Sequence, residues 1–397
     1  MTCVTGWICR LKRRTGRKEK MDSRWNDYFF ARSKDYHDFW QKYLTHEKNI
    51  LFILGGGFDP RMCLGLKSIL DKGGSGKRDC ILINFAERRN STLQSLQTDV
   101  EENRNKLYKL MKGVGEIREE LVRMEIDDRR TGPRESAEIF KDYAGFEGYT
   151  DILVDISSLP LHVYFPLIGK ILSILDHENE SGTKHIANLH VIVAENIRVD
   201  KLITKSGLSD DASYLHGFTG GLETISRERD PTVWIPVLGE GQKEQIELIE
   251  NFVSPKEICP VLPSPSINPK RGDEIMLEYG DLLTDQMQIE TRNIIYGSEQ
   301  NPFELYRQIH QTIRHYRDVL KPLGNPKFAI SPLSGKLMSL GSFLIAYEER
   351  SPEKSVGIAY VEPSGYSMEP EAKNGDVLGS CEMFSLWIFG DCYDAHL

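Results

Sequence analysis

One strand–turn–helix pattern occurs twice in this chain, and it restricts the possible folds more than any other feature. A short apolar run enters a glycine turn at Gly55 and again at Gly239, and another enters a polar serine turn at Asp155 and again at Ser331. The stretch of chain from Gly55 to Gly239 is nearly as long as that from Asp155 to Ser331, so the two copies keep a constant offset. An offset as long as a domain indicates duplication of a whole domain, because solenoid repeats are far shorter.

The expected secondary structure alternates between strands and helices in both halves. Short apolar runs bounded by turn residues are typical of buried parallel strands. In the first half we expect strands at 49–55, 80–85, 150–156 and 188–194, and helices at 62–70 and 160–175. In the second half we expect strands at 232–238, 257–263, 292–297, 327–331 and 356–361, and helices at 242–252, 273–283, 302–320 and 337–347. This alternation predicts an α/β fold of two tandem Rossmann-like units with mainly parallel sheets.

The predicted organisation has five parts. They are a basic tail with N-terminal helices (1–44), a first Rossmann-like unit (45–203), a linker or loop rich in Gly, Ser and Asp (204–230), a second unit (231–365) and an irregular C-terminal tail (366–397). Within the first unit, residues 98–144 are charged and predict a solvated helical insertion. Residues 1–20 have no apolar segment after their basic residues, which excludes a secretory signal and indicates a disordered tail or a misassigned start.

Charge and cysteine usage exclude several classes of protein. The 397 residues include 50 basic and 59 acidic ones, so the net charge of −9 argues against general binding of nucleic acids. No apolar run reaches the roughly 18 residues of a membrane-spanning helix. The seven cysteines are scattered without a C-x-x-C pair, so neither a metal site nor a disulfide framework is predicted. We therefore expect a cytoplasmic protein, since thiols stay reduced there.

The turns at the strand ends are the predicted ligand site, because ligands of open parallel sheets bind beyond the carboxyl ends of the strands. The glycines allow close backbone approach, and the helices that follow offer N–H groups to an anion. Ser331 to Lys336 is the most informative turn, with hydroxyls, a glycine and an exposed lysine at the start of a helix. We expect the Asp155 carboxylate either to accept hydrogen bonds from ribose hydroxyls or to cap its own turn. The predicted ligand-binding residues are Gly55, Gly56, Gly57, Asp59, Asp155, Ser157, Ser158, Gly239, Glu240, Gly241, Glu299, Asn301, Ser331, Ser334, Gly335 and Lys336.

The segment from Ser331 to Tyr347, a polar Ser/Gly/Lys turn followed by a helix with Met-Ser-Leu-Gly-Ser, resembles the signature of CRISPR-associated Rossmann-fold (CARF) sensors. It differs from their Thr-Gly-Gly-Thr-Lys turn at Pro332 and Leu333. The duplication resembles the SAVED sensors of bacterial antiphage systems, which contain two CARF-like units. This resemblance implies a sensor of a cyclic nucleotide or nucleotide derivative in antiviral defence. No nuclease, protease or membrane effector can be recognised in the sequence, so we expect any effector on a separate subunit, and the chain could form a homo-oligomer.

A second resemblance leaves an enzyme open as the alternative. Leu54 to Arg61 resembles the glycine turn of methyltransferases that bind S-adenosylmethionine, in which case Asn84 or Glu87 would hold the ribose. The alternative function is thus a methyltransferase or hydrolase acting on a nucleotide or S-adenosylmethionine. No Gly-x-Ser-x-Gly elbow or residue cluster with metal-ligand spacing occurs in the sequence, so catalytic residues and cofactors remain unassigned.

Overall fold

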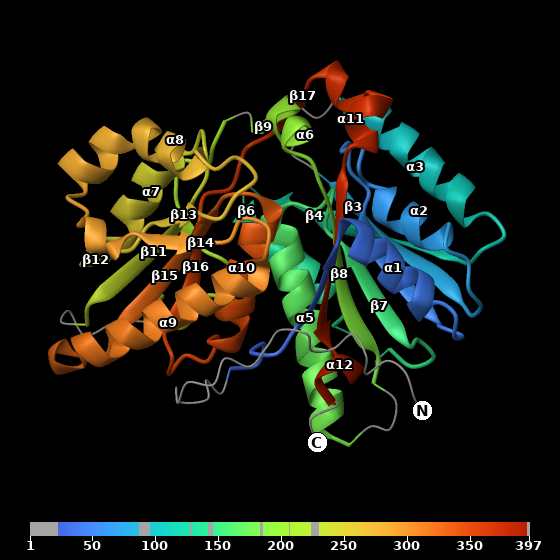
Figure 1. The fold of residues 1–397 in the computed structure, drawn as a ribbon, viewed down its shortest axis with the longest axis horizontal. Helices are drawn as coiled ribbons and strands as arrows, with labels where there is room; N and C mark the ends of the chain where they lie inside the picture. The colour runs from blue at the N-terminus through green and yellow to red at the C-terminus, as the bar shows by residue number, and fades with distance from the viewer. Residues whose placement is uncertain are drawn as a thin grey trace.

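Two mainly parallel seven-stranded sheets organise the chain (Figure 1). The computed structural model describes residues 23–86, 96–127, 129–141, 146–182, 186–205, 207–223 and 230–394. The basic tail predicted for residues 1–20 lies outside these ranges. In the described part of the chain, no helix is long and apolar enough to cross a membrane.

The first sheet has the strand order β1-β18-β8-β7-β2-β3-β4. Its strands are β1 (Phe29–Arg32), β2 (Ile50–Gly55), β3 (Arg78–Ala86), β4 (Ile117–Arg123), β7 (Asp151–Asp155), β8 (Asn188–Glu195) and β18 (Glu382–Phe389). Strands β8, β7, β2, β3 and β4 run parallel, whereas β18 is antiparallel to both of its neighbours, β8 and β1. Because β2 and β7 are covered on both faces, every residue in them is buried, which explains their unbroken apolar sequences.

The second sheet has the order β10-β16-β15-β11-β13-β14, with β12 paired to β11 beside β13. Its strands are β10 (Ser213–Tyr214), β11 (Thr232–Leu238), β12 (Glu257–Ile258), β13 (Val261–Pro263), β14 (Ile295–Gly297), β15 (Lys327–Leu333) and β16 (Val356–Tyr360). All pairs within this sheet are parallel except β10 with β16.

The parallel strands of the two sheets have the same topology. In each, the first strand along the chain is central, two strand positions lie to one side of it, and the last two strands lie to the other side. In the second sheet β12 and β13 both pair with β11 and together fill the first of these positions. The strand order therefore reverses between β2 and β7 in the first unit, and between β11 and β15 in the second. Shared topology confirms the prediction of two tandem Rossmann-like units in an α/β fold.

Helices cover both sheets, and two of them join the units. The helices of the first unit are α1 (Ser33–Tyr43), α2 (Leu64–Leu70), α3 (Gln97–Met111), α4 (Gly132–Glu138), α5 (Leu161–Glu180) and α12 (Asp391–Asp394). Those of the second unit are α7 (Lys243–Val253), α8 (Arg271–Glu278), α9 (Pro302–Leu320) and α10 (Lys336–Glu348). Figure 1 shows α5 and α10 between the two sheets. Their facing surfaces share one core, in which the Phe165 and Phe343 rings lie 5.3 Å apart.

A short antiparallel pair connects the units a second time. Strand β9 (Ile203–Lys205) pairs with β17 (Tyr366–Met368), so the chain leaving the first unit lies beside the chain returning to it. Figure 1 shows this pair next to α6 (Ile197–Leu202) and α11 (Gly375–Gly379). We call β9 and β17 the strap.

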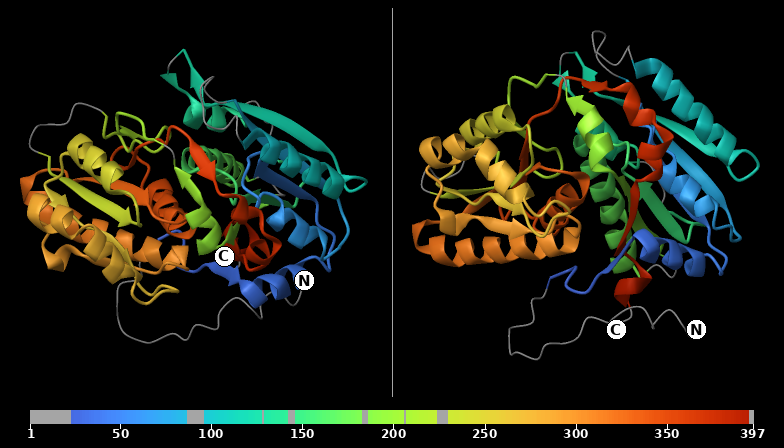
Figure 2. Two further views of the ribbon diagram at one scale, coloured as in Figure 1. Left: turned by 90° about the horizontal axis from the view of Figure 1, so that it is seen from above. Right: turned by 45° about the horizontal axis from the view of Figure 1, so that its top comes forward.

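Three sequence expectations for secondary structure are wrong in part. Residues 98–144 do not form one helical insertion, because α3 ends at Met111 and β4 forms the edge of the first sheet. The charged residues of β4 hide the apolar pattern of a strand from the sequence, because an edge strand is exposed to solvent along one side. The segment 1–44, expected to contain helices only, has a strand, β1, before its helix α1. The supposedly irregular C-terminal segment contains β18, which Figure 2 shows in red within the blue and green first unit.

Candidate functional site

The carboxyl ends of parallel strands from both sheets line one cleft. Its volume is about 900 Å³, within the size range of small-molecule sites. Residues in the turns that follow β2, β7, β11 and β15 line it, so both points of strand-order reversal open into the same space. This edge is where open α/β sheets bind their ligands.

Most of the predicted site residues lie around this cleft. The lining includes Gly56, Gly57, Asp59, Ser158, Gly239, Glu240, Gly241, Glu299, Ser334, Gly335 and Lys336. The structure thus brings together turns that are as far apart in the sequence as Gly56 and Lys336. Whether these residues bind a ligand stays a prediction.

The remaining predicted residues lie outside the cleft lining and have structural partners. Asp155 accepts a hydrogen bond from the Ser157 backbone N–H at 2.9 Å, which is the turn-capping role. The Ser157 hydroxyl accepts from the Ala194 N–H, and the Ser331 hydroxyl accepts from Trp234 Nε1. Asn301 caps α9 by accepting from the Phe303 N–H at 3.1 Å.

Gly55, the fifth predicted residue outside the lining, is required by packing. A Cβ added to it would lie 2.6 Å from Leu159 Cδ2. Packing also accounts for Gly239 in the lining, where a Cβ would lie 2.6 Å from the Leu333 carbonyl oxygen. These two glycines therefore do not by themselves indicate a ligand.

Ion pairs hold in place the polar side chains that the first unit contributes to the cleft lining. Arg61 donates to both carboxylate oxygens of Asp59, with Nη2 2.8 Å from Oδ2, and its Nη1 lies 2.8 Å from Asp200 Oδ1. Arg61 is only 3% exposed, so its charge is well matched by these two carboxylates. Asp59, predicted as a ligand contact, thus serves first to hold Arg61.

Similar ion pairs hold the polar side chains that the second unit contributes to the cleft lining. Arg271, at the start of α8, donates from Nε and Nη2 to the two carboxylate oxygens of Glu240, both at 2.7 Å. Its Nη1 also pairs with Glu299, which is 7% exposed. Glu299 in turn accepts from the Ile267 N–H at 2.9 Å. These pairs position the ends of β11 and β14 relative to α8.

The start of α10 is the point where the two units meet inside the cleft. Glu195, at the end of β8, accepts a hydrogen bond from the Leu337 N–H at 3.1 Å. Burial, together with nearby Asp200, raises the pKa of Glu195 to about 7. Lys336 donates from Nζ to the Leu159 carbonyl oxygen at 3.1 Å. The sequence predicts an exposed lysine here, whereas Lys336 is half-buried, and burial lowers its pKa.

Sequence reasoning missed several residues that line the cleft. His162 is 4% exposed, and its Nε2 lies 3.6 Å from Glu362 Oε1. Lys205, in the strap, donates to the side-chain oxygens of Gln242 and Gln245. His162 is the second residue of α5, shortly after the serine turn, where an apolar helix start gives no sign of a ligand contact, and Lys205 follows no such turn. Their proximity depends on α5 meeting the strap, which is a tertiary contact.

Two aromatic rings also border the cleft. Phe58 follows the glycine turn of the first unit, and Tyr366 lies in the strap. Their ring centroids are 5.8 Å apart. Aromatic faces beside polar groups are typical of sites for ligands with planar rings.

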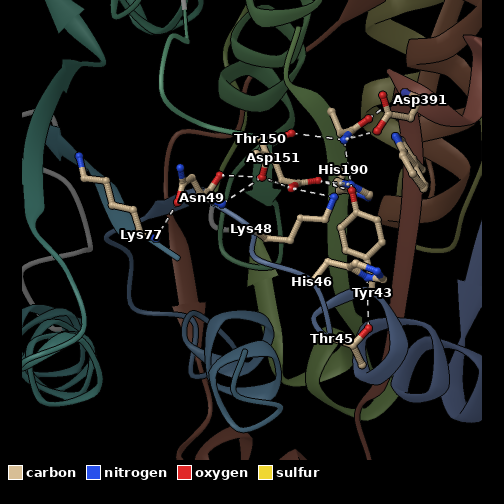
Figure 3. Close-up of polar contacts among 12 residues, drawn as sticks. Tyr43, Thr45, His46, Lys48, Asn49, Lys77, Thr150, Asp151, His190 and Asp391 are labelled. Carbon is tan, nitrogen blue, oxygen red and sulfur yellow. Dashed lines mark hydrogen bonds and ion pairs between the residues drawn. The ribbon is translucent and has the colours of Figure 1, made fainter. Parts of the chain in front are cut away.

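A separate polar cluster, drawn in Figure 3, lies at the amino end of β7, away from the cleft at its carboxyl end. Asp151, at the amino end of β7, accepts from the Tyr43 hydroxyl at 2.6 Å and contacts His190 Nε2 at 3.3 Å. Lys48 Nζ lies 3.8 Å from the second Asp151 oxygen, which also accepts from the Thr150 hydroxyl at 2.6 Å. Since Asp151 and His190 are fully buried, this cluster joins α1 to the sheet rather than binding a ligand.

Metal ligation was not predicted, and one group in the described residues has suitable side chains. His310, Glu348 and Glu349 have ligand atoms within 4.8 Å of one another. Glu349, however, is already paired with Arg317 at 2.8 Å and Lys354 at 2.9 Å, and Glu348 accepts from the Arg24 N–H. A cation would have to displace two existing positive charges, so this group serves α9–α10 packing.

Comparisons with known proteins give no family. No protein-family model matches the sequence, and a search of curated proteins finds no relative. Among solved structures, a NadR protein in complex with NR aligns with 76% of this chain and 86% of its own, at 9% identity and a TM-score of 0.21. A keto acid-selecting NRPS module with adenylation, ketoreductase and pseudo Asub domains aligns with 81% of this chain and 34% of its own, at 9% identity and a TM-score of 0.16. Scores this low support no functional argument, so function is argued from the cleft itself.

Proposed function

We propose that the cleft between the two units binds a nucleotide or nucleotide derivative. The observation that carries this proposal is the convergence of both points of strand-order reversal on one cleft of about 900 Å³. In a doubly wound fold each such point is a ligand site, and here the two are combined into one.

The chemistry of the lining supports a nucleotide in particular. The start of α10 and Lys336 offer N–H donors to a phosphate. Asp200 and Glu362 offer acceptors to ribose hydroxyls or base amino groups, and Phe58 and Tyr366 offer ring faces to a base.

We further propose that binding serves sensing rather than chemistry. Four of the carboxylates that line the cleft, those of Asp59, Asp200, Glu240 and Glu299, are held in ion pairs with arginines, which leaves them poorly suited to accept a proton. With the resemblance of 331–347 to CARF sensors, this favours a sensor in antiviral defence whose effector is a separate subunit.

One observation keeps a hydrolase as the alternative. His162 lines the cleft, burial lowers its pKa to about 4, and a neutral imidazole is able to act as a base. The methyltransferase alternative has less support. Asn84, the expected ribose ligand, instead donates to Glu119 at 2.8 Å, and Glu87 lies outside the described residues.

The test is identification of the ligand. Small molecules released from the purified protein by denaturation would be identified by mass spectrometry, and candidates would then be titrated by calorimetry. A recovered nucleotide that is bound and returned unchanged after incubation supports the sensor. Its conversion would establish the hydrolase, and recovery of S-adenosylmethionine would reject both.

A further inference from the structure

Most positive charges that line the cleft are already neutralised by the protein. Arg61 and Arg271 each pair with two carboxylates, and Arg130 Nε lies 3.9 Å from Glu362 Oε2. The charge of Lys201 helps to lower the pKa of Glu240. These cations therefore add little net positive potential to the cleft.

Two lysines of the lining are different, because their contacts are with neutral oxygens. Lys205 Nζ lies 3.1 Å from Gln242 Oε1 and 3.3 Å from Gln245 Oε1. Lys336 Nζ lies 3.1 Å from the Leu159 carbonyl oxygen. Within the described part of the chain, neither ammonium forms an ion pair with a carboxylate. Each ammonium has three N–H donors, so at least one on Lys205 and two on Lys336 remain for a ligand.

The two lysines are held at different places in the cleft. Lys336 begins α10 and contacts the turn that precedes α5, whereas Lys205 comes from the strap and contacts α7. Glutamine side chains and a backbone carbonyl orient both amines. The carboxylates of Asp59, Asp200 and Glu195 act on the charge of Lys336 without forming an ion pair with it. Such positions are suited to separate anionic groups of one ligand.

His162 provides a second, independent observation at the Lys205 position. Its Nε2 has no hydrogen-bond partner among the described residues, although the residue is only 4% exposed and lines the cleft. Burial lowers the pKa of His162 to about 4, and the charges of Lys205 and Arg130 act in the same direction. Lys205 and His162 thus line the same cleft, and His162 Nε2 lacks a hydrogen-bond partner and has the Glu362 carboxylate 3.6 Å away.

Resting on the proposed function, we infer that the ligand carries at least two phosphate groups, one held by Lys336 at the start of α10 and the other by Lys205 beside His162. A nucleoside would then contact neither lysine through a phosphate, and a nucleoside monophosphate would satisfy one lysine. Ligands with two or more phosphates would satisfy both.

The test measures binding of adenosine and guanosine, their mono-, di- and triphosphates, and inorganic tripolyphosphate by calorimetry. We expect the wild-type protein to bind a nucleoside diphosphate about 10- to 100-fold more tightly than the monophosphate, which is the effect of one charge-assisted hydrogen bond. Lys205→Ala should abolish this difference in affinity, and Lys205→Arg should retain most of it. Lys243→Ala is the matched control, because Lys243 is an exposed lysine in the first turn of α7 that does not line the cleft.

A chemical readout covers the case in which Lys205→Ala alters folding. The Lys205 amine of the wild-type protein would be acetylated with and without tripolyphosphate, and the modified peptide quantified by mass spectrometry. Protection of Lys205 and Lys336, but not of Lys243, is expected.

The outcomes separate this inference from the function on which it rests. Equal affinity for mono- and diphosphates, or an unchanged difference in affinity in Lys205→Ala, overturns the inference and leaves nucleotide binding intact. Binding of tripolyphosphate without binding of any nucleoside phosphate overturns the proposed function and retains the pair of anion positions. No binding of any of these compounds overturns both.

Discussion

The Glu195 carboxylate occupies the amino end of helix α10, where it accepts the Leu337 N–H at 3.1 Å. The two residues belong to different Rossmann-like units, so this hydrogen bond joins them across the cleft. A carboxylate at this place is favoured by the helix dipole, as a ligand phosphate would be. Glu195 and a bound phosphate would therefore compete for the same donors.

This competition predicts pH-dependent binding. Burial raises the pKa of Glu195 to about 7, so its carboxylate is ionised above that pH and repels an anion, whereas it is neutral below it. Affinity for a nucleoside phosphate should rise as the pH falls from 8 to 6. Glu195→Gln should raise affinity at pH 8 by about fivefold, the effect of about 1 kcal/mol at a helix terminus, and little at pH 6. Calorimetry at both pH values measures this, and an equal effect at the two pH values would contradict it.

Lys336→Ala should weaken both ligand binding and folding. Loss of a charge-assisted hydrogen bond to phosphate lowers affinity about 10- to 100-fold. Because Lys336 also donates to Leu159 across the unit interface, unfolding should become easier by about 0.5–1.5 kcal/mol. Calorimetric titration and urea denaturation measure the two effects. Unchanged affinity for a ligand that the wild type binds would remove this turn from the site.

Two buried histidines predict loss of stability in mild acid. Burial lowers the pKa of His162 to about 4 and also lowers that of His190, where it outweighs the opposing effect of Asp151. The unfolded chain binds these protons near pH 6.5, so stability is present above that pH and declines below it, by up to about 1.4 kcal/mol per pH unit for each histidine.

Urea denaturation of the wild type between pH 7.5 and 5 would show this decline. His162→Gln should reduce the slope of the free energy of unfolding against pH. His315→Gln, at an exposed position on α9, should leave that slope unchanged. A slope that is the same in all three proteins would refute the role of His162.

Helix α10 needs a glycine where it crosses α9. A Cβ on Gly341 would lie 2.8 Å from the Pro302 carbonyl oxygen and 2.9 Å from Leu305 Cδ2. Gly341→Ala should therefore destabilise the protein by about 1–3 kcal/mol through overpacking, although alanine is the better helix former. Gly280→Ala is the control, because nothing lies within 4 Å of its added Cβ. Thermal denaturation compares them, and equal midpoints would show that α9 moves to accommodate the methyl group.

The sequence was sufficient for what depends on local pattern. Unbroken apolar runs such as 50–55 identified the central strands, and Asn301-Pro302 marked the start of α9 correctly. Edge strands could not be found in this way, because β4 is half exposed and carries charges throughout. Strand β18 was missed for another reason. The turn-rich sequence before it suggested an irregular tail, and the whole second unit separates β18 from its partner β8 along the sequence.

The same division applies to the candidate site. Turns after strands were predictable, since chain direction alone places them at one edge of a parallel sheet. That the two edges face each other follows from packing of α5 against α10, which no local pattern encodes. Lys205 and His162 were missed for that reason, and Asp155 and Ser331 were included although their side chains serve the turn and the strand.

Strand β18 gives this chain an unusual order of assembly on the ribosome. Its position in the sheet, between β1 and β8, stays vacant after β8 ends at Glu195 until the segment that begins at Glu382 is made. At synthesis rates of about 5–20 residues per second this takes roughly 10–40 s, during which every strand of the second sheet is completed first. Meanwhile the backbone of β8 presents an unpaired edge, the feature that promotes aggregation of nascent chains. The last strand made is thus the one that protects the first sheet.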